Sequence, residues 1–266
     1  MAGIERTIHI IPLGHEIDRA VIPFDISKAD HVYILTGLEE INSRMDMSKQ
    51  QRYFAETVRQ KLQDKGISVA CRHVNLFDLR EVMKTISKII VEEKAKNNRI
   101  FVNMSAAGRL TSVAATLVGM AHNVQVYYVH ADEYPDDKKT RKEHGLSICT
   151  KQEVTQLTNF RIVMPDSTGL EILLFLSQQN RKVRMRDILE IMRSKNIEGF
   201  EENFETIRQS KKKRSVQSRQ LMKLDKTILA KLERNGFIIR TKDGRTTYVS
   251  ITESGNYAAH ISGLLE

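Results

Sequence analysis

The sequence contains no tryptophan, only two cysteines and no long apolar run. Cys71 and Cys149 lie far apart, which argues against a disulfide scaffold and against a zinc site built from cysteine thiolates. No apolar stretch approaches the roughly 20 residues that a membrane-spanning helix needs. The apolar run at residues 8–13 is too short for a secretory signal. These absences predict a cytoplasmic protein of the reducing cytosol, with no membrane partner.

The sequence also lacks the common nucleotide-binding motifs. Gly14 follows the first apolar run, but no G-x-G-x-x-G is completed there and no Walker lysine motif occurs. Nicotinamide dinucleotides and nucleoside triphosphates are therefore disfavoured ligands, and we expect neither a cofactor nor a metal. Without tryptophan or an RNP-like aromatic motif for base stacking, RNA is a weaker partner than DNA.

Positive charge is present in excess and is unevenly placed. The chain has a formal net charge of +9. Residues 1–165 hold 23 Lys and Arg against 20 Asp and Glu, whereas residues 166–266 hold 19 against 13. Within residues 208–245 alone the balance is 13 against 3. Because polyanion binding needs locally dense charge, this segment indicates contact with a nucleic acid.

Strand and helix patterns alternate through residues 1–165. Short runs rich in Val, Ile and Tyr predict strands at 6–13, 31–36, 66–74, 99–104 and 124–129. Helical patterns lie between them at 46–64, 78–96 and 108–121. This alternation predicts a Rossmann-like α/β domain with a parallel sheet and helices on its faces. Right-handed crossovers place the loops that follow the strands at one edge, where such sheets bind ligands.

Two of these loops carry a candidate site. Residues 14–19 follow the first strand, and residues 103–109 run small side chains into a helix start. Small side chains let a ligand approach the backbone, free N–H groups at a helix start favour phosphate, and arginines add charge-assisted contacts. The alternative is that Ala-Ala-Gly only packs the helix on its strand. The candidate ligand-binding residues are Gly14, His15, Glu16, Arg19, Gly37, Asn103, Met104, Ser105, Ala106, Ala107, Gly108 and Arg109.

Three further expectations concern this half. The helix after the second loop is expected to bury a stripe made by Leu110, Val113, Ala114 and Leu117. The charged stretch at 132–143 is predicted as a solvated loop, and residues 146–150 and 161–164 as further strands or a bridge. Residues 165–169 mark the domain boundary, where Ser167 or Thr168 is expected to cap the next helix.

Residues 166–266 have the pattern of an α+β winged helix-turn-helix domain. Helices are predicted at 169–179, 184–194 and 216–235, with a polar segment at 196–209 that is either a helix or a mobile insertion. Gly236 ends the third helix. Two β-branched runs, 237–241 and 246–251, flank an Asp-Gly turn and predict a hairpin. A final helix at 257–265 is expected to open at Glu253 or Ser254.

The third predicted helix has two opposed faces. Leu221, Leu224, Ile228 and Leu232 recur at steps of three and four, whereas Arg219, Lys223, Lys226 and Arg234 fall on the other side. A solvated basic face is the alternative, but the lysine run and the hairpin favour contact with double-stranded DNA. The candidate DNA-binding residues are Arg186, Lys211, Lys212, Lys213, Arg214, Ser218, Arg219, Lys223, Lys226, Lys242 and Arg245.

The segments "IIPLGHEIDRAVIPF" and "NMSAAGRLTSVAATLVG", followed by this winged helix, resemble archaeal CARF (CRISPR-associated Rossmann fold)–winged-helix transcriptional regulators. The resemblance implies a homodimer that binds a nucleotide second messenger, a cyclic oligoadenylate, across its two-fold axis. We therefore expect a ligand-responsive DNA-binding regulator rather than an enzyme. Two alternatives stay open: a ring nuclease in which Ser105, Arg109 or His15 acts on the ligand, and a dimeric interaction module without one.

Overall fold

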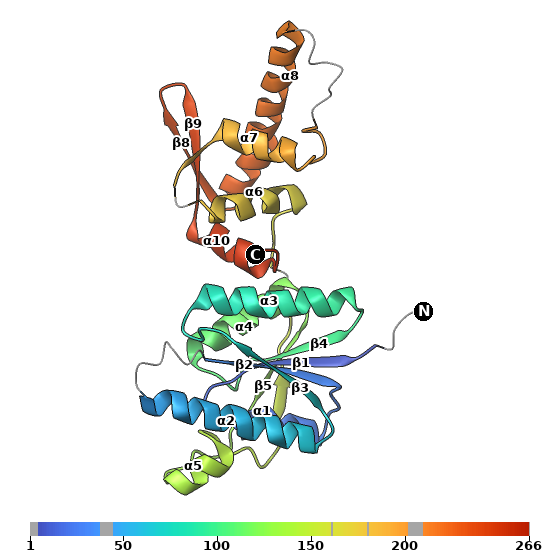
Figure 1. Ribbon diagram of the computed structural model, residues 1–266, viewed down its shortest axis with the longest axis vertical. Coiled ribbons are helices and arrows are strands. Elements are labelled where there is room, and N and C mark those ends of the chain that lie inside the picture. Colours follow the sequence, from blue (N-terminus) through green and yellow to red (C-terminus); the bar gives the residue numbers. More distant parts are fainter. Residues whose placement is uncertain (1–4, 38–44, 161, 180, 202–209, 266) are drawn as a thin grey trace. The chain divides into compact units, whose positions relative to one another are not determined.

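The structure of the protein is a computed structural model that describes residues 5–37, 45–160, 162–179, 181–201 and 210–265 (Figure 1). The chain divides into two compact units, Met1–Val163 and Met164–Glu266. Each unit has its own buried core, so the two are described separately.

The first unit is built on a six-stranded sheet with the order β3-β2-β1-β4-β5-β6. Its strands are β1 (Thr7–Pro12), β2 (His31–Thr36), β3 (Ser68–His73), β4 (Arg99–Asn103), β5 (Gln125–Val129) and β6 (Val154–Gln156). All neighbours pair in parallel except β5 and β6, which are antiparallel. The predicted Rossmann-like parallel sheet is thereby confirmed, with each of the five expected strands in place.

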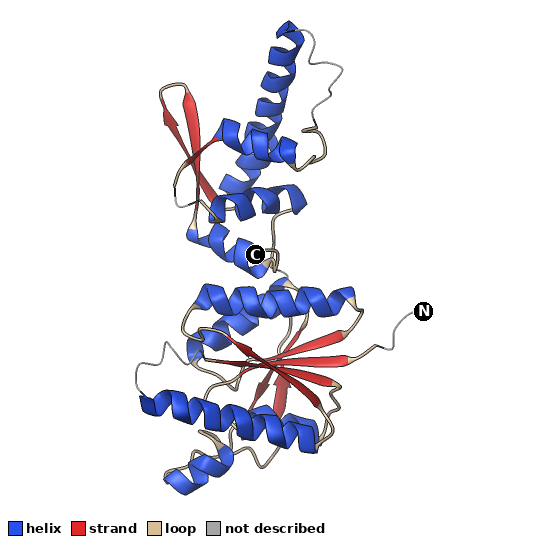
Figure 2. Ribbon diagram, in the orientation of Figure 1, coloured by secondary structure: helices blue, strands red, loops and turns tan. Residues whose placement is uncertain are grey.

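Helices cover both faces of this sheet (Figure 2). They are α1 (Asp18–Val21), α2 (Met45–Asp64), α3 (Leu79–Ala95) and α4 (Arg109–Ala121), whereas α5 (Lys138–His144) buries none of its residues. In Figure 1, α3 and α4 lie over one face, while α1 and α2 lie over the other. The central strands β1 and β2 are buried along almost their whole length for this reason, which explains their continuous apolar sequence.

The segment after β5 differs from the expected solvated loop. Residues 138–144 form helix α5, because the carboxylate of Asp137 accepts the backbone N–H groups of Lys139 and Thr140 and caps its first turn. The added antiparallel strand is Val154–Gln156, not residues 146–150, where Ile148 makes only an isolated bridge with Glu133. Residues 162–164 form no strand, and Arg161 lies outside the described residues.

The second unit is a winged helix domain, as predicted. Its elements are α6 (Ser167–Ser177), β7 (Val183–Arg184), α7 (Met185–Ser194), α8 (Ser210–Lys223), a π-helical segment (Leu224–Leu229), α9 (Ala230–Arg234), β8 (Ile238–Asp243), β9 (Thr246–Ile251) and α10 (Glu253–Ile261). The three strands pair in the order β7-β9-β8. We call the uninterrupted run from α8 to α9 the third helix and the β8–β9 hairpin the wing.

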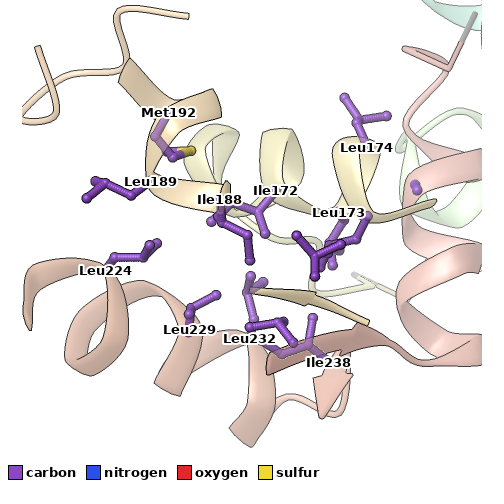
Figure 3. Packing of buried hydrophobic residues seen from close by; sticks show 14 of the residues in the cluster. Ile172, Leu173, Leu174, Ile188, Leu189, Met192, Leu224, Leu229, Leu232 and Ile238 are labelled. Atoms are coloured by element: carbon purple, nitrogen blue, oxygen red, sulfur yellow. The ribbon is translucent and has the colours of Figure 1, made fainter. Parts of the chain in front are cut away.

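The core of this unit joins the third helix to the two helices before it. Ile172 and Ile188 face Leu232 in Figure 3. The predicted apolar stripe is largely confirmed, since Leu224 and Leu232 are buried and the other two members are partly buried. Burial of one stripe leaves the opposite side of the helix in solvent.

Element ends in this unit differ from the prediction at three places. Asp166, rather than Ser167 or Thr168, caps α6 by accepting the N–H of Gly169. The third helix begins at residue 210, six residues before the expected start. The last helix begins at Glu253, as expected, where Thr252 accepts the N–H of Gly255 and supplies its cap, but it ends at Ile261 rather than at residue 265. Residues 202–209 of the expected insertion lie outside the described residues.

Candidate ligand-binding and DNA-binding sites

The two loops singled out by the sequence meet at the carboxyl edge of the sheet. The backbone N–H of Gly14 donates to the carbonyl of Ala106 at 2.7 Å. The side-chain amide of Asn103 donates to the carbonyl of Arg19 at 2.8 Å. The loops approach because β1 and β4, which they follow, are parallel neighbours. Residues about 90 positions apart in sequence thus form one surface.

The start of α4 presents backbone N–H groups without a side-chain cap. Gly108 occupies the N-cap position in an extended conformation, and it cannot accept a hydrogen bond through a side chain. Both Gly108 and Arg109 are exposed. A helix start of this kind attracts an anion through its unpaired N–H groups and its dipole. The geometry suits a phosphate group, and Arg109, the exposed first residue of the helix, adds a positive charge.

Two polar side chains of the second loop form hydrogen bonds within the protein. Asn103 and Ser105 are buried, and the Ser105 hydroxyl donates to the Asn103 side-chain oxygen at 2.6 Å. The same hydroxyl accepts the backbone N–H of Val129 at 3.1 Å. Met104, the residue between them, donates its N–H to Tyr127. These three residues shape the loop on β5, while the half-buried Ala107 follows the fully buried Ala106 toward solvent.

Arg19 is held by contacts inside the protein. Its guanidinium donates to the Ser105 carbonyl at 3.1 Å and to the Tyr128 hydroxyl at 3.2 Å, and it lies over the Tyr128 ring. Only 11% of its side chain is exposed. Arg19 therefore ties the first loop to the second loop and to β5. Of the two arginines predicted for the site, Arg109 is the exposed one.

Residues 144–149, which no motif marked as part of the site, pack against the first loop. The Ser147 hydroxyl donates to Glu16 at 2.9 Å, and the Nδ1 atom of His144 lies 2.9 Å from an Asp18 carboxylate oxygen. Gly145 has a φ of +90° and lies so close that an added Cβ would be 2.6 Å from the Ile17 nitrogen. Glycine directly after a short charged helix was the available signal for this contact.

The first loop is also covered from the side of α2. The side-chain amide of Gln51 donates to the Leu13 carbonyl at 2.7 Å, and the His15 ring stacks on Phe54 with centroids 5.1 Å apart. Burial lowers the pKa of His15, so the neutral imidazole is favoured. Gly37 is half-buried at the end of β2, directly before residues that lie outside the described part of the chain.

Glu16 is an unusual carboxyl group because it is buried beside few donors. Its Oε2 atom has no hydrogen-bond partner among the described residues, and the residue is 7% exposed. Burial raises its pKa from 4.5 to about 7, although the Ser147 hydroxyl and Arg19 act in the opposite direction. The protonated acid is therefore the form that the folded protein favours over the unfolded chain.

This pKa predicts how stability depends on pH. A raised pKa in the folded state gives a contribution that is complete below the unfolded value and is lost as pH rises through about 7. Glu16→Gln is therefore expected to leave stability little changed near pH 5 and to increase it by about 1–2 kcal/mol near pH 8. Urea denaturation at both pH values measures this, with exposed Glu92→Gln as the control. An equal effect of Glu16→Gln at both pH values would contradict the assignment.

The outer face of α4 corrects one expectation. Leu110 and Val113, predicted to be buried, are 48% and 50% exposed. Other residues are buried instead: Thr111, Ala114, Ala115, Val118 and Gly119. A Cβ on Gly119 would lie 2.2 Å from a Val126 methyl group, so the helix packs closely against β5. The sequence pattern misled because two of its apolar residues, Leu110 and Val113, lie on the exposed side of the helix.

The winged helix domain exposes seven of the predicted DNA-binding side chains: Arg186, Ser218, Arg219, Lys223, Lys226, Lys242 and Arg245. Lys211, Lys212, Lys213 and Arg214 lie on α8, but their side chains are outside the described residues. The Lys223 ammonium lies 5.0 Å from the centre of the Phe200 ring, so part of its interaction energy is used within the domain. The exposed cations come from α7, the third helix and the wing tip.

Other cations of the basic segment are paired inside the domain. Lys231 contacts the Asp166 carboxylate at 2.7 Å, and Arg240 contacts both Asp225 and Glu233. The sequence count of 13 Lys and Arg therefore overstates the charge available to a polyanion. No helix in the described part of the chain is both long enough and apolar enough to cross a membrane.

Two family models match the chain, one for each unit. Residues 7–134 match the model described as HFX_2341_N:-like, N-terminal, and residues 168–263 match the DUF6293 C-terminal winged helix domain. The chain thus combines a Rossmann-like N-terminal domain with a C-terminal winged helix domain. This is the domain order of the CARF–winged-helix proteins that its sequence resembles.

Individual relatives are more distant. Over 158 residues the chain is 23% identical to uncharacterized protein MJ1513 of Methanocaldococcus jannaschii, covering 57% of this chain and 43% of that protein. Enterococcus italicus Csm6 bound to cyclic hexa-2'-fluoro-hexa-dAMP has 13% identity and a TM-score of 0.44, with 72% of this chain and 50% of Csm6 covered. Sulfobacillus thermosulfidooxidans Can2 in complex with cyclic tetra-adenylate has 10% identity and a TM-score of 0.38, with 95% and 63% covered. The chain spans less than two thirds of each of these proteins.

Proposed function

We propose that this protein is a transcriptional regulator that binds double-stranded DNA and responds to a nucleotide second messenger. The observation that carries the proposal is the set of exposed cations on the third helix and wing of a winged helix domain. In such domains this helix enters the major groove and the wing lies against the backbone or minor groove. Arg219 and Lys226 would then reach the duplex from the helix, and Arg245 from the wing.

The ligand we propose is a cyclic oligoadenylate. Its phosphodiesters match the uncapped start of α4, and the exposed Arg109 adds a charge-assisted contact. Ala107 and Gly108 leave room for the ligand to approach the backbone. The missing G-x-G-x-x-G and Walker motifs disfavour dinucleotides and nucleoside triphosphates. The resemblance of both loops to CARF ligand motifs supports the same choice.

A homodimer completes the proposal, and the outer face of α4 supports it. Leu110 and Val113 are exposed one turn apart on the same helix face. Burying such a face against a second copy would remove apolar surface from water. The face lies on the helix whose start is the candidate phosphate site. A two-fold axis beside α4 would therefore bring two phosphate sites together.

Sedimentation of the purified chain is expected to show a dimer at micromolar concentration. Replacing Leu110 and Val113 together with glutamate should shift the equilibrium to monomer, because four charges would enter the two-fold interface without partners. Ile26→Glu, which alters an exposed apolar residue elsewhere in the unit, should leave the dimer intact. A monomeric wild type, with and without DNA, would overturn the shared ligand site.

Regulation requires that the ligand bind two arrangements of the dimer with different affinity. A ligand can shift an equilibrium only by its differential affinity for the two states, and each tenfold difference corresponds to about 1.4 kcal/mol. The two arrangements would differ in the spacing or angle between the third helix of one subunit and that of the other, since half-sites lie about one turn of DNA apart.

The test combines a ligand screen with DNA titration of the full chain. Linear and cyclic oligoadenylates are compared for their effect on the melting temperature, and duplex binding is then measured with and without each stabilising ligand. The proposal predicts that a cyclic oligoadenylate raises the melting temperature and alters DNA affinity. DNA binding without a response to any nucleotide would support the ligand-free interaction module instead.

A second candidate is cleavage of the bound ring. One observation favours it: His144 is oriented by the buried Asp18 carboxylate, beside the first loop. A histidine oriented in this way can accept a proton, here from a ribose 2'-hydroxyl, when the hydroxyl lies within reach. Chromatography of a cyclic oligoadenylate after incubation separates the two functions. Loss of the intact ring with wild type but not with His144→Ala would favour the nuclease, and intact ligand would favour the sensor.

A further inference from the structure

Arg240 joins the wing to the third helix through a set of short contacts. Its guanidinium donates to the Glu233 carboxylate at 2.6 and 2.9 Å and to the Asp225 carboxylate at 2.7 Å. Its backbone N–H donates to the other Glu233 oxygen at 3.0 Å. One residue of β8 therefore holds two acidic residues of the third helix, with 23% of its own side chain exposed.

The same guanidinium reaches the backbone of the third helix where the helix is irregular. Residues 224–229 are π-helical, and the Asp225 carbonyl accepts the N–H of Ala230, five residues later. That carbonyl also accepts an Arg240 N–H at 3.0 Å. A π-helical turn is rare within an α-helix and is often found at functional sites. Arg240 thus fixes the wing at the point where the third helix changes its winding.

The outer part of the wing has no comparable attachment to the described residues of the third helix. Residues 241–247 form hydrogen bonds within the hairpin and none with the helices in the described part of the chain. Lys242 and Arg245 are exposed near the turn, where Gly244 has a φ of +56°. Among the described residues, Arg240 is consequently the residue of β8 nearest the tip that is tied to the third helix by hydrogen bonds.

The positive charge of Arg240 is paired with carboxylates inside the domain. Asp225 and Glu233 offset it, and the contact with Arg240 lowers the pKa of Glu233. A guanidinium held by two carboxylates is poorly suited to a phosphate contact of its own. Its effect on a bound duplex would therefore come from where it places the wing.

We propose that Arg240 is a positioning residue for DNA recognition: it sets the wing at the angle to the third helix at which both contact one duplex together. This inference rests on the proposed function, because it presumes that both elements bind DNA. A guanidinium suits the task better than an ammonium, since its planar fork can hold a carboxylate through two N–H groups.

The alternative is that the cluster only stabilises the fold, and coupling between variants distinguishes the two. When Arg240 positions the wing, the contribution of the wing-tip Arg245 depends on Arg240. In a purely stabilising role, Arg245→Ala would cost the same affinity in either background. Affinity is measured by fluorescence anisotropy on a mixed-sequence DNA duplex of about 30 base pairs, roughly three helical turns.

The variants are Arg240→Met, Arg245→Ala and their combination, each in the full chain. We expect Arg245→Ala to weaken binding about 5- to 10-fold and to lower the salt dependence by about one phosphate contact in the wild-type background. In the Arg240→Met background the further loss should be less than about twofold. Lys231→Met is the matched control, because it removes one paired cation of the third helix and should leave the Arg245 effect unchanged.

A second pair of variants guards against a folding defect. Exchanging the charges, as Arg240→Glu with Glu233→Arg, restores an ion pair between the same positions, and circular dichroism reports whether each variant is folded. The exchanged protein should recover part of the Arg245 effect that Arg240→Glu alone abolishes. An Arg245 effect that is equal in all backgrounds, or absent in the wild type, would overturn the positioning role of Arg240 and leave the proposed DNA binding standing. A wild type that does not bind duplex DNA would overturn the proposed function itself.

Discussion

A protein with both Arg219 and Lys226 changed to alanine is expected to bind duplex DNA about 30-fold more weakly than the wild type. Two lost contacts of about 1 kcal/mol or more each give about 2 kcal/mol, which corresponds to this factor in Kd. Both side chains are exposed on the third helix, so their removal should not disturb the core. Titration over a range of salt concentrations should also give a dependence shallower by about two phosphate contacts.

The matched control removes two lysines from the other domain. Lys138→Ala with Lys139→Ala lowers the net charge by the same amount on exposed residues of α5. This control variant should bind DNA almost as well as the wild type, because affinity depends on local charge density. Equal weakening by both double variants would mean that the third helix is not the contact. Lys223 is less suited to this test, since its ammonium also lies near the Phe200 ring.

The second large effect is expected at the start of α4. Arg109→Ala should weaken binding of a cyclic oligoadenylate by about 1.5–3 kcal/mol, roughly 10- to 150-fold, when the ligand is largely desolvated. Ala107→Leu should block the approach of the ligand to the backbone. Calorimetry measures the ligand affinity of each variant, and DNA titration in the presence of ligand measures the response.

For Arg109→Ala and Ala107→Leu, the two sensor variants, DNA binding measured without ligand is an internal control. Because neither residue belongs to the winged helix unit, DNA binding without ligand should equal that of the wild type. Lys61→Ala, which removes an exposed cation from α2, should bind ligand normally. Should both sensor variants bind ligand and respond like the wild type, the turn at residues 105–109 only packs the helix on its strand.

Periodicity predicted the fold well wherever one face of an element is buried. The alternation of strands and helices gave the parallel sheet, and the apolar stripe of the third helix gave its buried side. Periodicity misled on α4, because the alanines and Gly119 are buried while Leu110 and Val113 are exposed. Residue size, rather than apolar character, decides which side of a helix can pack closely on a strand.

The candidate site could be predicted only in part. Strand order placed the two loops together, because loops that follow parallel strands share an edge. The contacts of His144 and Ser147 with the first loop are more than 120 residues apart in sequence and follow no local pattern. Nor did charge counting separate the exposed Arg219 from Arg240, which two carboxylates hold inside the domain.

The close packing of α4 on β5 bears on how a signal would leave the ligand site. Without a Cβ on Gly119, the far end of the helix lies against Val126 and has little freedom to shift. The helix is 13 residues long, or roughly 20 Å, and its exposed start is the proposed phosphate site. Because its far end is held against β5, a force on its first turn would rotate the helix about that end. In the proposed dimer, a phosphate that displaced the first turn would also move Leu110 and Val113. Ligand binding would thereby change the contact between the two subunits.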